Sequence, residues 1–222
     1  MVRGKIINTL EKYLSQLLKC DILPPGSYLA GGTAVYLYLK HRISVDLDFF
    51  TPENFNLEIF IHGIKKCFDD VDVELMEKNT VILFISKEKI KFSLFFFPYE
   101  LLSETQSYVL QNDIICPLAS LEDIEAMKAV AVNQRGSAKD FIDLYFILKK
   151  TGHWFDDILK LVRKKYDLEK EYEYQLRTSF IYFDDAEREV DSIFLVKEDG
   201  KYEKIRKNEW EEIKTFFKGF LK

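Results

Sequence analysis

The chain has 222 residues, of which 47% are hydrophobic and 15% aromatic, so it is long and apolar enough to bury a substantial core. This composition excludes a disordered protein and favours one domain or two closely packed lobes. The formal net charge of −5 weighs against a protein whose whole surface coats nucleic acid, so any contact with RNA must use a local basic patch. Basic residues gather at 160–165 and 201–207, although most charge runs of this kind are solvated faces.

The first fifty residues alternate between helical and strand patterns. Apolar residues recur with a helical period over residues 3–20, and Pro24-Pro25-Gly26 then breaks the chain before a buried strand that ends at Ala30. The sequence next predicts a helix over residues 34–40. A strand over residues 45–49 follows, in which apolar residues alternate with aspartates.

A helix and three strands are predicted next. Phenylalanine and isoleucine residues recur on one face of a helix over residues 55–68. Strand patterns cover residues 71–76, 80–86 and 89–97, with a hairpin turn at 86–88. This order of helix, strand and short meander predicts an α+β fold in which helices cover one face of a sheet.

The pattern is helical beyond Pro117. Helices are predicted over residues 118–133, 139–150, 155–165, 172–180 and 208–221. The sequence therefore predicts two parts, a core over residues 1–116 and a helical C-terminal lobe over residues 117–222 that packs against it.

The sequence gives no sign of a membrane or of an oxidising compartment. The first twelve residues carry three basic side chains and no uninterrupted hydrophobic region follows them, so no signal segment is expected. The apolar run 92–97 is too short to span a bilayer. Cys20, Cys67 and Cys116 are odd in number and widely spaced, which argues against a disulfide framework and against a zinc site. We therefore expect a cytoplasmic protein with no membrane partner.

The most informative segment runs from Tyr28 to Phe50. Gly31 and Gly32 allow the backbone to approach a ligand closely, and the helix that follows presents its N-terminus to an anion. The turn Gly31-Gly32-Thr33 therefore has the features of a phosphate-binding turn. Thr33 is equally suited to be an ordinary helix N-cap.

Two carboxylates follow this turn. Side chains alternate between the faces of a strand, so Asp46 and Asp48 point to the same face. Mg²⁺ prefers oxygen ligands and is commonly held by one or two carboxylates together with substrate phosphates. The glycine turn and the aspartate pair together predict a site for an NTP and Mg²⁺, with Mn²⁺ as the alternative cation. Phosphoryl or nucleotidyl transfer is the first hypothesis for the reaction.

Two more charged clusters occur at residues 123–128 and 135–143. On a helix, Lys139 and Asp143 are neighbours because they lie four residues apart. The second cluster therefore presents mixed charges toward a cleft, or it forms an ordinary surface ion-pair ladder. Lys128 shares its predicted helix with several apolar residues, so not every charge on that helix faces water.

Four motif regions carry a resemblance to a known family. They are Gly31-Gly32-Thr33 followed by Ser44-x-Asp46-x-Asp48; Lys89-Ile90-Lys91-Phe92-Ser93; Asp123-Ile124-x-Ala126-Met127-Lys128; and Arg135-x-x-x-Lys139-Asp140-Phe141-x-Asp143. With these motifs the chain resembles the AbiEii/AbiGii toxin family of nucleotidyltransferases, distant relatives of the DNA polymerase β superfamily. The resemblance spans most of the chain and implies a mixed-sheet nucleotidyltransferase core followed by a helical lobe.

The resemblance also implies roles for individual residues. Asp46 and Asp48 would hold Mg²⁺, and Lys128 would neutralise charge that develops on the phosphates. Asp143 would position a partner or assist the attacking hydroxyl. The residues expected to contact the nucleotide are Gly31, Gly32, Thr33, Arg42, Ser44, Lys91, Arg135, Lys139 and Asp140. A surface ion pair is the ordinary alternative for Arg42.

One position departs from the superfamily pattern. A third carboxylate usually lies on a later strand next to a lysine, and here that position is Ser93, which cannot replace a carboxylate in binding two cations. Asp72 and Glu74 alternate correctly on a neighbouring strand, but the apolar residues between them are expected to pack inward and leave these acids facing solvent. Three interpretations stay open: one well-held metal, a compensating acid such as Asp140 or Asp143, or nucleotide binding without turnover.

The resemblance implies a function. The leading hypothesis is a magnesium-dependent nucleotidyltransferase that moves a nucleoside monophosphate from an NTP to a hydroxyl of RNA, tRNA included, or of a protein. Such a protein would be the toxin of a toxin–antitoxin or abortive-infection pair, restrained by a cognate antitoxin. The alternatives are a nucleotide-binding regulator that binds NTP without turnover, and an antibiotic-type nucleotidyltransferase that modifies a small molecule and has no RNA dependence.

Overall fold

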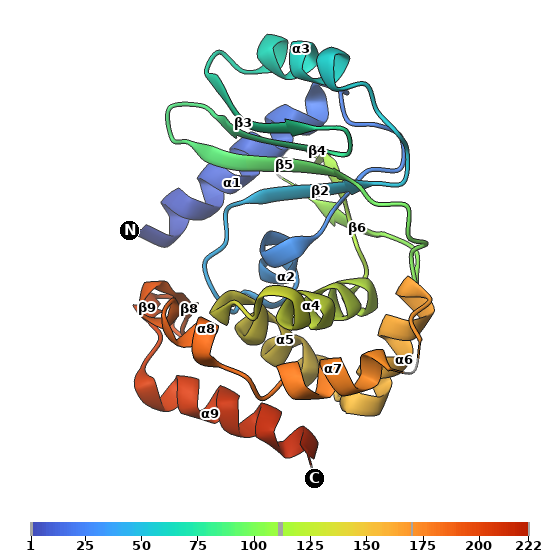
Figure 1. Ribbon diagram of the computed structural model, residues 1–222. Coiled ribbons are helices and arrows are strands. Elements are labelled where there is room, and N and C mark those ends of the chain that lie inside the picture. The colour runs from blue at the N-terminus through green and yellow to red at the C-terminus, as the bar shows by residue number, and fades with distance from the viewer. Residues whose placement is uncertain (1, 111–112, 170, 222) are drawn as a thin grey trace. The chain divides into compact units, whose positions relative to one another are not determined.

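The computed structural model describes residues 2–110, 113–169 and 171–221 (Figure 1). The chain divides into two compact units. Unit 1 comprises residues 1–34, 44–100 and 104–119, and unit 2 comprises residues 35–43, 101–103 and 120–222. The chain first passes from unit 1 to unit 2 inside helix α2 (Gly31–Leu39), whereas the boundary predicted after residue 116 falls within strand β7 (Ile115–Leu118).

Unit 1 is built on a mixed seven-stranded sheet. Its other strands are β1 (Tyr28–Leu29), β2 (Leu47–Thr51), β3 (Val71–Glu77), β4 (Thr80–Ile85), β5 (Ile90–Phe96) and β6 (Gln106–Val109). The strand order is β3-β4-β5-β2-β1-β7-β6. Strand β2 is parallel to β5 and β1 is parallel to β7, while the other neighbours are antiparallel.

The two faces of this sheet differ in burial because side chains alternate along each strand. The fully buried side chains of one face, which we call the core face, include Leu47, Phe49, Leu83, Phe92 and Leu94. The opposite face carries Asp48, which is half-buried, and we call it the aspartate face. The alternation predicted for β2 is therefore confirmed from Leu47 onward.

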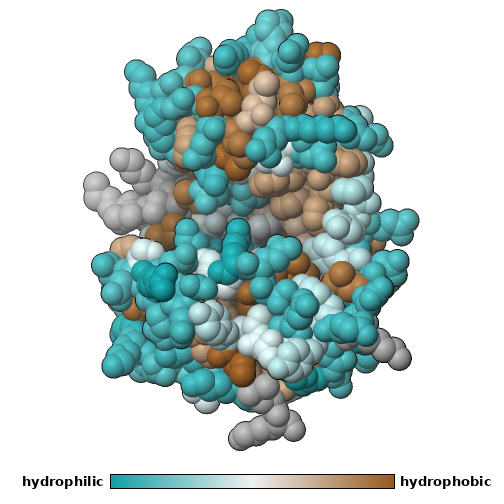
Figure 2. All heavy atoms as spheres, in the orientation of Figure 1, coloured by the Kyte–Doolittle hydropathy of each residue, from teal (hydrophilic) through white to brown (hydrophobic). Residues whose placement is uncertain are grey.

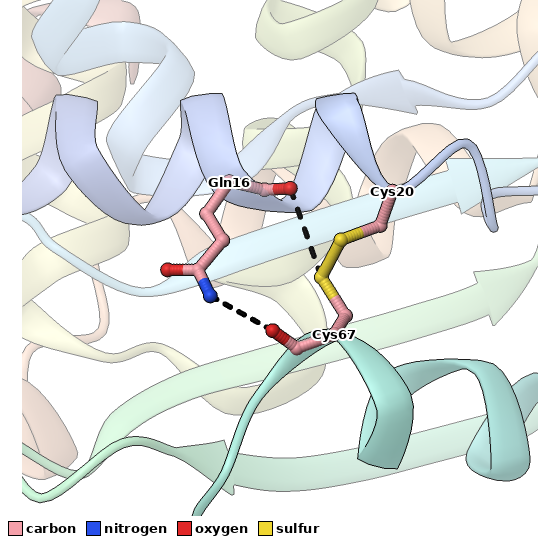
Figure 3. Close-up of a disulfide and its surroundings, with 3 residues drawn as sticks. All are labelled: Gln16, Cys20 and Cys67. Carbon is pink, nitrogen blue, oxygen red and sulfur yellow. Dashed lines mark hydrogen bonds between the residues drawn. A yellow bond between two sulfur atoms is a disulfide. The ribbon is translucent and has the colours of Figure 1, made fainter.

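Helices α1 (Val2–Lys19) and α3 (Leu57–Cys67) belong to unit 1. The Phe60 ring of α3 lies 5.9 Å from the Phe92 ring, which places α3 on the core face. The end of α1 is joined to the end of α3, because the Gln16 side chain donates a hydrogen bond of 2.8 Å to the carbonyl oxygen of Cys67 (Figure 3). The apolar stripes of the two helices therefore contribute to one core.

A disulfide between Cys20 and Cys67 reinforces this junction, and their Cα atoms lie 6.1 Å apart (Figure 3). The argument against a disulfide from the odd, widely spaced cysteines was therefore wrong. Spacing along the chain is a poor guide here because the fold brings the carboxyl ends of two separate helices together. Cys116 is buried and is not part of this bond.

Unit 2 is mainly helical. Its elements are the second part of α2, α4 (Leu121–Arg135), α5 (Ala138–Thr151), α6 (Phe155–Tyr166), α7 (Tyr172–Ser179), α8 (Asp184–Glu187), η2 (Val190–Ser192), β8 (Phe194–Val196), β9 (Tyr202–Lys204), α9 (Lys207–Lys218) and η3 (Gly219–Leu221). Its core is aromatic: the Phe141 ring of α5 lies 5.3 Å from the Phe217 ring of α9, which in turn lies 5.6 Å from the Phe180 ring.

The predicted α+β fold with a mixed sheet is confirmed, and so are the predicted long helices. Four short strands, β6 to β9, were missed because each has only three or four residues and no sustained alternation. The helix predicted from residue 118 begins at Leu121, since Ser120 accepts a hydrogen bond from the Asp123 amide as its N-cap. Val73 was expected to pack inward and pairs with the buried Leu83, but it is 37% exposed on β3, the edge strand of the sheet.

A helix that crosses a lipid bilayer needs about 20 consecutive, mainly apolar residues. No helix in the described ranges is both long enough and apolar enough to cross a membrane.

Candidate functional site

Gly31 begins α2 and lies against Asp48. Its φ of +66° is a left-handed conformation that favours glycine, and a Cβ added there would lie only 2.8 Å from Oδ2 of Asp48. The amide of Ala30 donates a hydrogen bond of 3.0 Å to the carbonyl oxygen of Asp48. The glycine therefore allows a carboxylate to lie directly against the first turn of a helix, where backbone N–H groups are available to an anion.

The aspartate pair lies at the start of β2. Leu47 and Phe49 are fully buried on the core face, so Asp48 between them projects from the opposite face. Asp46 is half-buried and directly precedes the strand. The structure therefore places Asp48 on the aspartate face, and that Asp46 shares this face stays a prediction from the alternation of side chains.

Thr33 and Ser44 join α2 to the segment that precedes the aspartate pair. The Thr33 hydroxyl is fully buried in the first turn of α2, and its Oγ1 lies 3.0 Å from Oγ of Ser44 in a hydrogen bond. The N-cap alternative for Thr33 was wrong, because α2 already begins at Gly31. The bond instead ties the glycine turn to the segment that leads into β2.

Ser93 occupies the neighbouring position on β5. It pairs in register with Asp48 on one side and with Ile82 on the other, so its side chain lies on the aspartate face. Ser93 is only 1% exposed, and its hydroxyl has no hydrogen-bond partner among the described residues. Lys91, two residues earlier on the same strand, is half-buried on this face.

The other acidic residues considered for this face do not supply a third ligand. Asp72 and Glu74 are exposed on β3, as expected, and Asp72 forms an ion pair of 3.3 Å with Lys89. Over the part of the chain that the structure describes, no group of three or more His, Cys, Asp or Glu side chains is arranged to hold a metal ion. A cation at Asp46 and Asp48 would therefore need oxygen ligands from a substrate.

The second group of predicted residues forms a buried ion cluster in unit 2. Arg42 donates two hydrogen bonds to Asp143, from Nε to Oδ1 at 2.6 Å and from Nη2 to Oδ2 at 2.8 Å. Lys128 bonds the same carboxylate at 2.7 Å and Asp140 at 2.9 Å. Arg135 then donates to Asp140 from Nε at 2.6 Å and from Nη2 at 2.9 Å. The structure thus joins five of the predicted residues through two carboxylates.

This cluster differs from the surface ion pairs that the sequence allowed. Arg42 is 4% exposed, Lys128 is buried, and Asp140 and Asp143 are fully buried, so the pairs that Arg42 and Lys128 form with these carboxylates are shielded from water. Burial alone would raise the pKa of Asp143, but Arg42, Lys128 and His41 hold that pKa well below its usual range. Asp143 is therefore ionised at neutral pH. Lys139, by contrast, lies exposed on α5 outside the cluster.

Two charged groups of the cluster change the expected chemistry. Burial would lower the pKa of Lys128, yet Asp143 and Asp140 raise it above its usual value, so this lysine stays charged. Asp143 accepts hydrogen bonds on both oxygens and is buried, which is unsuitable for a group that must remove a proton from a hydroxyl. The geometry therefore favours a positioning role for Asp143 over that of a general base.

Sequence reasoning missed His41. Its Nε2 lies 2.6 Å from Oδ1 of Asp143, and burial lowers its pKa although Asp143 opposes this effect. A neutral His41 therefore donates to the carboxylate without adding another buried charge. The only signal in the sequence was its position beside Arg42, and a lone histidine next to an arginine has many ordinary explanations.

The chain is similar to known proteins in sequence. A family model described as "Nucleotidyl transferase AbiEii toxin, Type IV TA system" matches residues 12–221. The chain is similar to an uncharacterized protein of Aquifex aeolicus strain VF5, aq_aa25, with 38% identity over 201 residues that cover 88% of this chain and 86% of that protein.

The fold is similar to that of a solved structure. The nucleotidyltransferase toxin MenT4 from Mycobacterium tuberculosis H37Rv aligns with a TM-score of 0.53 and 14% identity, over 100% of this chain and 85% of that chain. At this level of identity the likeness concerns the fold alone.

Proposed function

Because the chain belongs to the AbiEii nucleotidyltransferase toxin family, we propose that it transfers a nucleoside monophosphate from an NTP to a hydroxyl of an RNA acceptor, with Mg²⁺ held at Asp46 and Asp48. Nucleotidyl transfer and membership of a toxin–antitoxin system are properties of the family. The single observation that carries the finer proposal is the packing of Gly31 against the Asp48 carboxylate at the start of α2.

The glycine turn is suited to bind the triphosphate. Helix α2 begins at Gly31, so the first N–H groups of the helix and the positive end of its dipole lie beside Asp48. Phosphate oxygens that bind there would lie within reach of a cation at Asp48. Ser44 and Thr33 fix the position of this turn, and Lys91 is the basic side chain on the same face.

The donor set fits one hard cation better than two. Asp46 and Asp48 supply carboxylate oxygens, and the third position of the superfamily is a neutral serine, Ser93. The remaining ligands of Mg²⁺, or of Mn²⁺, would be phosphate oxygens and water. A bound Mg²⁺ supplies stabilisation of the charge that develops as the bond to pyrophosphate breaks.

The buried cluster of unit 2 is assigned a supporting role in this proposal. Asp143 holds Arg42 and Lys128 in fixed positions, and Asp140 does the same for Lys128 and Arg135. The side chain of Arg135 is 65% exposed, so it is the cation of the cluster that is best placed to meet a substrate. Lys139 is exposed nearby in sequence and remains a candidate for nucleotide contact.

The proposal is tested by measuring the transfer of a labelled nucleotide from an NTP to possible acceptors. Purified protein is incubated with Mg²⁺, one α-labelled NTP at a time and total RNA, and the label is traced into RNA, protein and small molecules. We expect transfer to RNA that Asp46→Asn and Asp48→Asn each reduce by at least about 100-fold, because each removes a charge from the cation site. Asp72→Asn is the matched control, since Asp72 is an exposed carboxylate of the same sheet.

Each outcome of this experiment has a clear meaning. Equal transfer by the parent and by both site variants would place the chemistry elsewhere. NTP binding without any release of pyrophosphate would indicate a regulator without turnover. Label found only on protein or on a small molecule would replace RNA as the acceptor. Membership of a toxin–antitoxin family also implies a cognate antitoxin.

A further inference from the structure

A continuous row of aromatic side chains lies on the aspartate face of unit 1. Phe50 of β2 pairs in register with Phe95 of β5, and their rings are 5.1 Å apart. The Phe97 ring lies 5.2 Å from Phe50, and the Tyr99 ring lies 4.9 Å from Phe97. We call these four side chains the aromatic row.

The aromatic row is not needed to fill the core. The aromatic rings that do fill it, Phe49 and Phe92, are fully buried and point to the core face. Members of the row are only half-buried, and Tyr99 is 42% exposed. Figure 2 shows brown to tan hydrophobic atoms at the surface of unit 1, where Figure 1 places the ends of β2 and β5. Flat apolar rings are therefore available at the surface, where their contact with water is unfavourable.

The row has a defined position relative to Asp48. Asp48 and Phe50 lie two residues apart on one face of β2, which is about 7 Å. Gly31 lies toward the other end of that strand, since β1 runs antiparallel to β2 and the amide of Ala30, the residue after β1, meets the Asp48 carbonyl. Ser44 precedes that end of β2 in the chain and is bonded to Thr33 of the glycine turn. Asp48 is therefore flanked by the glycine turn on one side and by the aromatic row on the other.

Nucleotidyl transfer needs an in-line arrangement, with the attacking oxygen opposite the leaving pyrophosphate. Under the proposed function, on which this inference rests, the triphosphate binds at the glycine turn, so the acceptor hydroxyl must approach from the side of the aromatic row. We propose that the aromatic row binds the acceptor, and that an unpaired base next to the reacting ribose stacks on Phe95, Phe97 and Tyr99. Every base offers a π-face, so the row favours single-stranded RNA ends without selecting a sequence.

Three variants separate stacking from simple apolar packing. Phe97→Leu keeps an apolar side chain but removes the ring, and Tyr99→Ala removes an exposed ring that the core does not need. Phe55→Leu is the matched control, because Phe55 is a half-buried ring of the same unit that contacts Phe60, on the core-face side of the sheet. Tyr99→Ala keeps the test valid if Phe97→Leu fails to fold.

Binding and turnover are measured separately. The binding probe is a short fluorescent single-stranded RNA of random sequence, added with Mg²⁺ and without NTP. The transfer assay gives one KM for total RNA and one KM for the NTP. We expect Phe97→Leu and Tyr99→Ala each to weaken probe binding and raise the KM for RNA about tenfold, as base–aromatic stacking predicts. The KM for the NTP and all values of Phe55→Leu are expected to match the parent.

The outcomes distinguish this inference from the proposed function. If the parent is active on RNA and both variants keep the parent's probe binding and KM for RNA, the aromatic row does not bind the acceptor. Nucleotidyl transfer would then remain the proposed reaction. An effect on the KM for the NTP alone would also overturn it. A parent that binds the probe through the row yet transfers no label would support the row and refute the proposed reaction. Label on protein with no probe binding would overturn the row.

Discussion

At the scale of single residues, the site depends on the absence of a side chain at Gly31. Replacing it by alanine forces a left-handed residue to carry a Cβ, at about 1–2 kcal/mol, and brings that Cβ to 2.8 Å from Oδ2 of Asp48. The carboxylate must then move, and misplacement by about 1 Å is enough to slow a reaction about 100-fold. We therefore expect Gly31→Ala to lose about that much transfer activity in the labelling assay.

Gly152→Ala is the matched control for this change. Gly152 ends α5 with a φ of +74°, but a Cβ there meets nothing within 4 Å. It carries the same backbone strain without the clash, so its thermal midpoint is expected to fall as that of Gly31→Ala does while activity is kept. Similar activity in both variants would mean that the closeness of Gly31 and Asp48 is unimportant.

Ser93 allows a direct test of how many cations the site holds. Ser93→Asp adds a third carboxylate in register with Asp48, which is expected to lower stability in the absence of metal because like charges lie about 5 Å apart. Added Mg²⁺ or Mn²⁺ is then expected to raise the thermal midpoint of this variant more than that of the parent, since a ligand stabilises the state that binds it.

Two further variants make the Ser93 test specific. Ser93→Asn has a similar size but no charge, so it is expected to show no added response to the cation. Ser93→Ala is expected to change stability by less than about 1 kcal/mol, because the hydroxyl it removes is buried without a hydrogen-bond partner among the described residues. Equal responses of the aspartate and asparagine variants would argue against a cation at this face.

At the scale of elements, Asp143 joins α5 to Lys128 of α4 and to the segment after α2 that carries Arg42. Asp143→Asn removes the carboxylate that buried Arg42 and Lys128 share and leaves Lys128 only its bond to Asp140, which costs about 3–5 kcal/mol of unfolding free energy. Urea unfolding measures this loss. Asp185→Asn is the control, because Asp185 meets Arg188 at 4.0 Å in an exposed pair and is expected to matter by less than about 0.5 kcal/mol.

The same cluster predicts how stability depends on pH. Burial would raise the pKa values of Asp140 and Asp143, but their cationic partners lower both. The pKa of each group is thus lower in the folded than in the unfolded chain, so its contribution is present above about pH 4 and is lost as the pH falls through the folded values. The urea midpoint is expected to decrease as the pH is lowered below about 4, and to decrease less steeply for Asp143→Asn than for the parent. A parallel decline would assign the acid sensitivity to other carboxylates.

The sequence predicted those elements whose pattern is long. The period of 3.6 identified α1, α3, α4, α5, α6 and α9, and the alternation around Leu47 and Phe49 identified β2 and the face of Asp48. Their spacing of four residues also predicted that Lys139 and Asp143 are neighbours on one helix. The spacing did not predict which charge faces inward: in the structure Asp143 is buried and Lys139 is exposed. Periodicity fixes neighbours within an element, whereas His41 and Asp143 are about a hundred residues apart and meet through tertiary packing.

At the scale of the whole molecule, the chain has two compact units with separate cores, and the disulfide constrains only one of them. Cys20 and Cys67 both belong to unit 1 and are separated by 47 residues. A cross-link over a loop of this length stabilises the folded state by at most about 4 kcal/mol, mainly by restricting the unfolded chain. Reduction is therefore expected to lower the thermal midpoint of unit 1.

The two tryptophans provide a way to see this selectively, because Trp154 and Trp210 both lie in unit 2. Circular dichroism reports on both units, while tryptophan fluorescence reports on unit 2. A reductant is expected to bring the transition seen by circular dichroism to lower temperature than the transition seen by fluorescence. Cys116→Ala is expected to respond as the parent does, and a variant with Cys20→Ala and Cys67→Ala is expected not to respond. Coincident transitions before and after reduction would show that the units unfold together, because a constraint inside one would then stabilise both.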